Sequence, residues 1–89
     1  MTYYSLYSRD MKHFNRMFPA GSDLEAKALV RNVLINSEDS RHELKDASLY
    51  SVCEFNDATA AIKPKKKLIC HVEQIPIPNK EVNAIETIE

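Results

Sequence analysis

Hydrophobic and polar residues alternate near the start of the chain, in the segment YYSLY. Two-residue alternation with aromatic side chains is typical of a β-strand. We expect this strand to direct Tyr4 and Leu6 toward the core and to place Tyr3, Ser5 and Tyr7 on the opposite face.

The next segment, residues 8–21, lacks this alternation, because charged residues are mixed with scattered apolar ones and Pro19 and Gly21 close the segment. The pattern favours an irregular or briefly helical loop. A helix should follow, because Ser22 and Glu25 have the spacing of a capping box, in which each side chain satisfies a backbone N–H of the other residue.

Apolar residues then recur at intervals of three and four, which is the period of an amphipathic helix. They form a single stripe that needs a partner surface: Ala26, Leu29, Val30, Val33 and Leu34. Lys27 and Arg31 lie on another side, where we expect a solvated face. The helix is predicted to end near Asn36, and the polar residues 37–47 favour a loop or a loose helical turn.

The segment LYSVCEF, residues 49–55, predicts a second strand. Regular alternation would group its residues into two faces, with Leu49, Ser51, Cys53 and Phe55 on one and Tyr50, Val52 and Glu54 on the other. Residues 56–59 contain Asn and Asp, which favour a turn, so a returning arm should follow up to Val72. Pro64 cannot donate to a sheet ladder, so this arm is expected to be an edge strand or to be broken there.

The predicted order is strand, helix, strand, strand. It indicates an α+β fold in which one helix packs on one face of a small antiparallel or mixed sheet. Residues 1–72 would form this single domain, and residues 73–89 an extended, Pro-containing arm that is acidic and apolar. Because so small a domain buries only about 60% of its unfolded surface, we expect a homodimer or higher homo-oligomer, with the arm packed across a partner subunit.

Composition excludes several classes of function. Among 89 residues there is one glycine, so no glycine-rich phosphate loop is available and no cofactor is expected. The N-terminus lacks a secretory pattern and no apolar stretch approaches about 18 residues, so we expect a cytoplasmic protein without a membrane span. No histidine has a partner at catalytic spacing, and capping accounts for Ser22 and Glu25, so we do not expect an enzyme.

Cys53 and Cys70 are the two cysteines, and both lie in apolar, strand-like segments. In a reducing compartment they are expected to be small buried hydrophobes, with a disulfide or a metal site as alternatives. No local pair of ligands has the spacing of a zinc site, so no metal is predicted.

The formal net charge of −1 hides an uneven distribution. Residues 1–72 contain 11 Lys+Arg and 9 Asp+Glu, a net of +2, whereas residues 73–89 contain 1 and 4, a net of −3. The most concentrated positive feature is KPKKK, which places four lysines within five positions, directly before the apolar run LIC. The body of the protein is therefore mildly basic and its arm is acidic.

The segment LYSVCEFNDATAAIKP, together with the opening YSLYSRD and the helix EAKALVRNVLIN, resembles the small nonstructural DNA-binding protein of gokushoviruses, phages of the Microviridae with single-stranded DNA genomes. The matching positions of the long segment are Leu49, Tyr50, Val52, Glu54, Phe55, Asp57, Ile62 and Pro64. Three features depart from the family: Cys53 stands at a usual glycine, Ala60 or Ala61 stands at a turn glycine, and the lysine run and the tail have no counterpart.

The resemblance implies binding of single-stranded DNA during genome synthesis or packaging in the bacterial host cytoplasm, without enzymatic activity. It supplies no contact residues, so the candidates come from chemistry: cations that follow phosphates and rings on which bases stack. They are Arg9, Lys12, Arg16, Lys63, Lys65, Lys66 and Lys67, with Tyr3 and Tyr7.

These assignments have alternatives. The lysine run could contact phosphates, resemble a nuclear import peptide, or keep a sticky strand from aggregating at the sheet edge. Tyr3 and Tyr7 could instead face the core or a dimer interface. The whole protein could be a protein-interaction factor, a phage scaffold or host-takeover protein whose apolar arm binds a phage or host protein.

Overall fold

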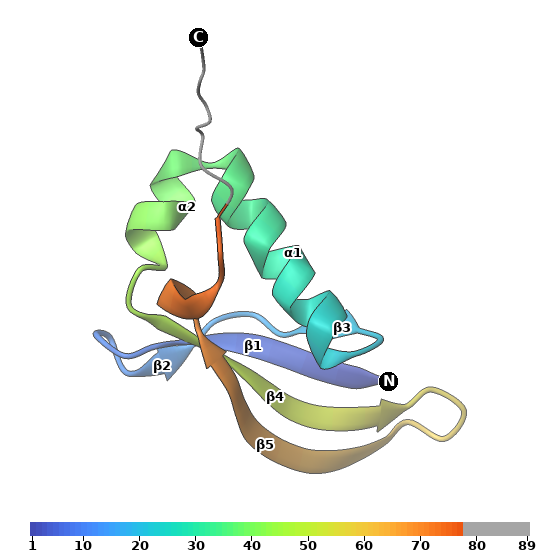
Figure 1. The fold of residues 1–89 in the computed structure, drawn as a ribbon. Coiled ribbons are helices and arrows are strands. Elements are labelled where there is room, and N and C mark those ends of the chain that lie inside the picture. The colour runs from blue at the N-terminus through green and yellow to red at the C-terminus, as the bar shows by residue number, and fades with distance from the viewer. Residues whose placement is uncertain (78–89) are drawn as a thin grey trace, which may run out of the picture.

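A five-stranded antiparallel sheet carries the fold, and one long helix covers one of its faces (Figure 1). The structure, a computed structural model, describes residues 1–77. Its elements are β1 (Thr2–Ser8), β2 (His13–Phe14), β3 (Phe18–Ala20), α1 (Asp23–Asn36), α2 (Glu38–Glu43), β4 (Ala47–Asn56), β5 (Ala61–His71) and the 3₁₀ turn η1 (Val72–Gln74). The predicted α+β class is confirmed, and the sheet is antiparallel.

The strands lie in the order β2-β1-β4-β5, and β3 also pairs with β1. Because β4 occupies one edge of β1 along its whole length, β2 and β3 share the other edge. The prediction of an irregular loop for residues 8–21 holds for residues 9–12 and 15–17, but it missed these two strands. These two strands have only two and three residues, which is too short for alternation to be visible in the sequence.

The core lies between the sheet and α1. Tyr4 and Leu49, from the two central strands, are only 2% and 0% exposed. Ala26 and Val30 of α1 are small buried residues that belong to the same core cluster. The predicted core face of the first strand is confirmed. The predicted helix stripe is only partly covered, because Leu29 and Val33 are among the exposed hydrophobic residues.

The start of α1 is held by three polar contacts. The Ser22 Oγ accepts from the backbone N–H of Glu25 at 3.1 Å, as predicted, whereas the Glu25 carboxylate accepts from Gly21, one residue earlier than expected, at 2.9 Å. The Tyr4 hydroxyl donates to Asp23 Oδ1 at 2.6 Å. A carboxylate in the first helical turn also interacts favourably with the helix dipole. The central strand β1 is thereby joined directly to the helix.

At its other end, α1 is followed at once by the short helix α2. Arg41 of α2 donates from Nη1 to the carbonyl of Leu34 at 2.6 Å, which satisfies one of the last carbonyl groups of α1. The loose helical turn that the sequence allows in residues 37–47 is thus a defined helix of six residues.

Strand β4 contains a bulge that changes which side chains share a face. Tyr4 pairs with Ser51 but Tyr3 pairs with Cys53, so Val52 is an extra residue on β4. Beyond the bulge, Phe55 contacts the ring of Tyr3. The predicted grouping of Cys53 and Phe55 with the core residue Leu49 is therefore wrong, because it assumed regular alternation.

Strand β5 is an edge strand, as Pro64 predicted: in the described chain it pairs with β4 alone. The turn that leads into it begins at Asn56, whose side chain accepts from the backbone N–H of Ala58 at 2.9 Å. Ala60 closes this turn with a φ of 64°. This is the left-handed conformation in which glycine is favoured over residues that carry a Cβ.

After β5 the chain passes through η1 and runs up beside α1 (Figure 1). We call residues 72–77 the strap. Val72 and Ile75 are buried, and the Arg31 Nε donates to the carbonyl of Pro76 at 3.1 Å. The first part of the predicted arm thus packs on the core. Residues 78–89, and with them the predicted packing across a partner subunit, lie outside the described residues.

Ala60→Gly is expected to raise the free energy of unfolding by about 0.5 to 1 kcal/mol. A residue with a Cβ is strained by about 1 to 2 kcal/mol in the left-handed region, and glycine removes this strain. Part of the gain in stability is offset because glycine also gives the unfolded chain more conformational freedom. Urea unfolding followed by circular dichroism measures the change. Ala58→Gly, in the same turn without a positive φ, is the control and should lower stability. An Ala60→Gly variant no more stable than the parent would contradict the assignment.

The Tyr4 hydroxyl makes the fold sensitive to alkaline pH. Burial, and after it the hydrogen bond to Asp23 and that residue's charge, raises the pKa of Tyr4 from 10.0 to about 12. The unfolded chain therefore releases this proton first. Its contribution to stability is complete below pH 10 and is lost as the pH rises from 10 to 12. Urea midpoints of the parent and of Tyr4→Phe, compared between pH 8 and 11, should converge as the pH rises. Parallel curves would show that Tyr4 does not titrate this way.

Candidate nucleic-acid interface

Three aromatic rings gather on the sheet face that α1 leaves open. The ring centroids of Tyr7 and Phe14 are 4.8 Å apart, those of Phe14 and Tyr50 5.5 Å, and those of Tyr7 and Tyr50 6.1 Å. Strand pairing explains the cluster: Phe14 lies opposite Tyr7, and Tyr50 lies opposite Ser5, diagonal to Tyr7. Phe14 is exposed and the two tyrosines are half-buried. We call these three rings the aromatic cluster.

A second pair of rings lies at the other end of β1. Tyr3 and Phe55 meet edge to face, with ring centroids 6.2 Å apart. Together with Met17, Cys53 and Ile62 they line a shallow apolar hollow. We call Tyr3 and Phe55 the distal pair. The open face thus carries aromatic surface at both ends of β1.

The polar residues of this face are satisfied within it. Ser5 is fully buried and its Oγ donates to the carbonyl of Asn15 at 2.7 Å. Ser48, opposite Tyr7, is also buried, and its Oγ lies 2.7 Å from the Nδ1 of His71. Buried hydroxyls that already have partners add no unsatisfied group to the surface. The aromatic rings are therefore what this face offers to a ligand.

The lysine run is divided among different surroundings. Lys65 bonds Glu54 at 2.8 Å, and Lys67 lies 3.9 Å from Asp23 at the start of α1. Lys66, between them in sequence, has its Nζ 5.8 Å from the centroid of the Tyr50 ring, within cation–π range. Adjacent residues of a strand point to opposite faces. Lys66 is thus the member of the run that contacts the aromatic cluster.

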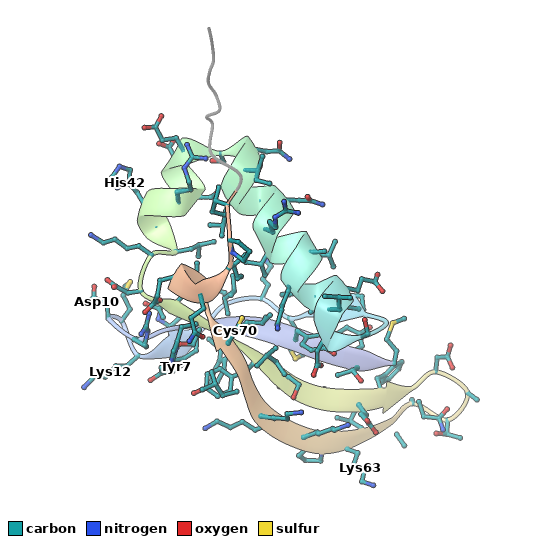
Figure 2. The ribbon with its side chains drawn as sticks, viewed as in Figure 1. Tyr7, Asp10, Lys12, His42, Lys63 and Cys70 are labelled. Atoms are coloured by element: carbon teal, nitrogen blue, oxygen red, sulfur yellow. The ribbon has the colours of Figure 1, made fainter. Side chains whose placement is uncertain are left out.

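The partners of Lys65 and the position of Lys63 confirm that these two are separate from the cluster. The hydrogen bond and positive charge of Lys65 lower the pKa of Glu54, and Glu54 raises the pKa of Lys65. Lys63 lies opposite Glu54 near the β4–β5 turn, and Figure 2 shows its side chain pointing outward, away from the helices.

The cations before α1 are also dispersed. Arg9 is engaged within the fold: its Nε donates to the carbonyl of Asp46 at 2.8 Å and its Nη2 to Glu73 at 2.6 Å, which lowers the pKa of Glu73. Lys12 lies at the tip of the β1–β2 turn with a φ of 59°, at the end of the sheet opposite to Lys63 (Figure 2). Arg16 is exposed between β2 and β3.

Of the predicted contact residues, the structure brings Tyr7 and Lys66 together around Tyr50 and leaves Tyr3 at the far end of the same face. Sequence reasoning missed Phe14, Tyr50 and Phe55. Tyr50 carried a usable signal, because the predicted strand already placed it on the face opposite Leu49. Phe14 and Phe55 carried none, because their positions depend on the short strand β2 and on the bulge.

The cysteines were the remaining candidates for a disulfide or a metal site. Cys53 is buried, Cys70 is half-buried, and both thiols are free; burial raises the pKa of Cys70. In residues 1–77 no three His, Cys, Asp or Glu side chains gather where they could hold a metal ion. No helix of the described chain is both long and apolar enough to cross a membrane.

Comparisons of this chain with protein-family models, with curated proteins and with solved structures find no match. The likeness to the gokushovirus DNA-binding proteins therefore depends on the motif residues quoted above.

Proposed function

We propose that the open face of the sheet binds single-stranded DNA, with bases stacked on the aromatic cluster and a phosphate near Lys66. The observation that carries the proposal is the meeting of three accessible rings with a lysine on a sheet face that no described helix covers. Every base has a face that can stack, so such a site tolerates different sequences. RNA-recognition sheets use aromatic residues on an open face in the same way.

The charge distribution indicates which force dominates. Within residues 1–77 one lysine contacts the cluster, and the other cations of the run have acidic neighbours or lie elsewhere. Stacking should therefore supply most of the affinity, at about 1 to 3 kcal/mol per base. Each phosphate contact on a single strand adds only about −0.7 to the salt slope, so the dependence of binding on salt should be shallow.

The resemblance supplies the biological setting of this proposal. A non-enzymatic, sequence-tolerant binder would coat or guide phage DNA during genome synthesis or packaging in the bacterial host cytoplasm. The small core and the open apolar face also favour action as a homodimer or higher homo-oligomer.

One observation favours the alternative, a protein-interaction factor. Leu29 and Val33 of α1 are 40% and 47% exposed and adjoin Leu6, Phe18 and Leu44 in an apolar depression. A phage or host protein could bind there. The apolar arm, to which the sequence assigned this role, lies beyond the described residues.

Fluorescence anisotropy with a labelled 12-nucleotide oligothymidine separates the two functions. We expect binding at 50 mM salt that weakens by less than about tenfold at 200 mM, since few phosphates are contacted. Tyr50→Leu keeps an apolar side chain but removes a stacking surface, and should weaken binding about 5- to 100-fold.

Lys66→Ala and Lys67→Ala form a matched pair, because they remove the same charge from adjacent residues. Lys66→Ala should lower affinity and flatten the salt slope by about 0.7, whereas Lys67→Ala, near Asp23, should change little. Equal effects of the two variants on affinity would show that the open face is not the DNA-binding site. No binding at 50 mM salt would reject DNA binding altogether and leave the protein-interaction factor.

A further inference from the structure

A groove runs between α1 and the strap, on the helix side of the sheet. Its walls are mostly apolar and come from three separate parts of the chain: Leu24 and Ala28 of α1, Ile69 of β5, and Ile75 and Pro76 of the strap. Leu24 is 76% exposed although it lines this groove. An apolar surface of this kind is normally covered by another segment or partner.

The charges of the groove are of one sign. Lys27 and Arg31 are the ionisable side chains other than Cys70 that line it, and within residues 1–77 neither has a carboxylate within 4 Å. Arg31 is held at the rim by its bond to the carbonyl of Pro76. Lys27 is near enough to Cys70 for its charge to act on the thiol. The groove therefore fits a segment that is apolar and acidic.

The chain itself contains such a segment. Residues 78–89, PNKEVNAIETIE, have three glutamates and one lysine, with Val82, Ile85 and Ile88 as apolar residues. Ile77, the last described residue, packs against the core, so this segment begins beside the groove. Twelve residues can span up to about 40 Å, whereas α1 is about 21 Å long. A tether this short gives an effective concentration in the millimolar range.

We propose that the groove binds residues 78–89 of the same chain, with the apolar residues on Leu24, Ala28 and Ile69 and the glutamates beside Lys27 and Arg31. This interaction is independent of DNA binding, because the groove and the open face lie on opposite sides of the sheet. It would cover the apolar wall and keep the acidic residues away from the site proposed for DNA.

The two cysteines report the two faces separately. Cys70 lines the groove (Figure 2), whereas Cys53 lines the hollow beside Tyr3 on the open face. The experiment measures labelling of the full-length protein by N-ethylmaleimide at pH 8, with each cysteine quantified by peptide mass spectrometry. A segment that covers the groove slows labelling at Cys70 alone.

Two variants remove the proposed contacts. One combines Ile85→Ser with Ile88→Ser, and the other changes Glu81, Glu86 and Glu89 to Gln. Each should accelerate Cys70 labelling about fivefold, as expected if the segment occupies the groove about four-fifths of the time. The matched control, Asn83→Ser with Thr87→Ser, should label at the parental rate. Excess synthetic peptide of residues 78–89 should restore slow labelling of Cys70 in the serine variant, which also shows that this variant is folded.

Three outcomes would overturn the proposal. Unchanged labelling of Cys70 in both variants would show that the segment does not cover the groove. Faster labelling at Cys53 instead would place it on the open face. Parental labelling of Cys70 that slows as the protein concentration rises would mean that a second copy, rather than the same chain, supplies the segment.

Discussion

Coverage of only one face of the sheet by α1 is the constraint on which the rest of the structure depends. The chain builds one long helix, and its small buried residues, among them Ala26 and Val30, let it pack closely on the sheet beside Tyr4 and Leu49. The bond from Tyr4 to Asp23 joins helix and sheet at one end. Side chains that point to the other face then find no covering element in the described chain, so that face gathers aromatic residues.

Sequence patterns predicted the elements that are long and regular. The strand at YYSLY, the capped start of α1 and the position of Pro64 in an edge strand all follow from local rules and are confirmed, although Leu29 and Val33 of the predicted stripe are exposed. The strands β2 and β3 escaped prediction because they are held by pairing with β1 and not by a pattern of their own. The faces of β4 were predicted correctly only as far as Ser51, because the bulge at Val52 depends on the neighbouring strands.

Charged residues that are adjacent in the sequence need not form one charged patch on the surface. Four lysines within five positions predicted one basic site, but a strand distributes such a run over two faces. Glu54 and Asp23 then engage Lys65 and Lys67, and only Lys66 meets the aromatic cluster. The candidate site is consequently more aromatic and less basic than the sequence indicated, which also makes the proposed DNA binding compatible with a net charge of −1.

The bulge at Val52 makes the length of β4 as important as its composition. If Val52 took a regular place in the strand instead, alternation would turn Cys53 and Phe55 toward α1 and Glu54 to the open face. Phe55 would then leave the ring of Tyr3, and Glu54 would lose Lys65 as its partner. A substitution in β4 therefore changes one side chain, whereas straightening the bulge would exchange the two surfaces of the strand beyond it at once.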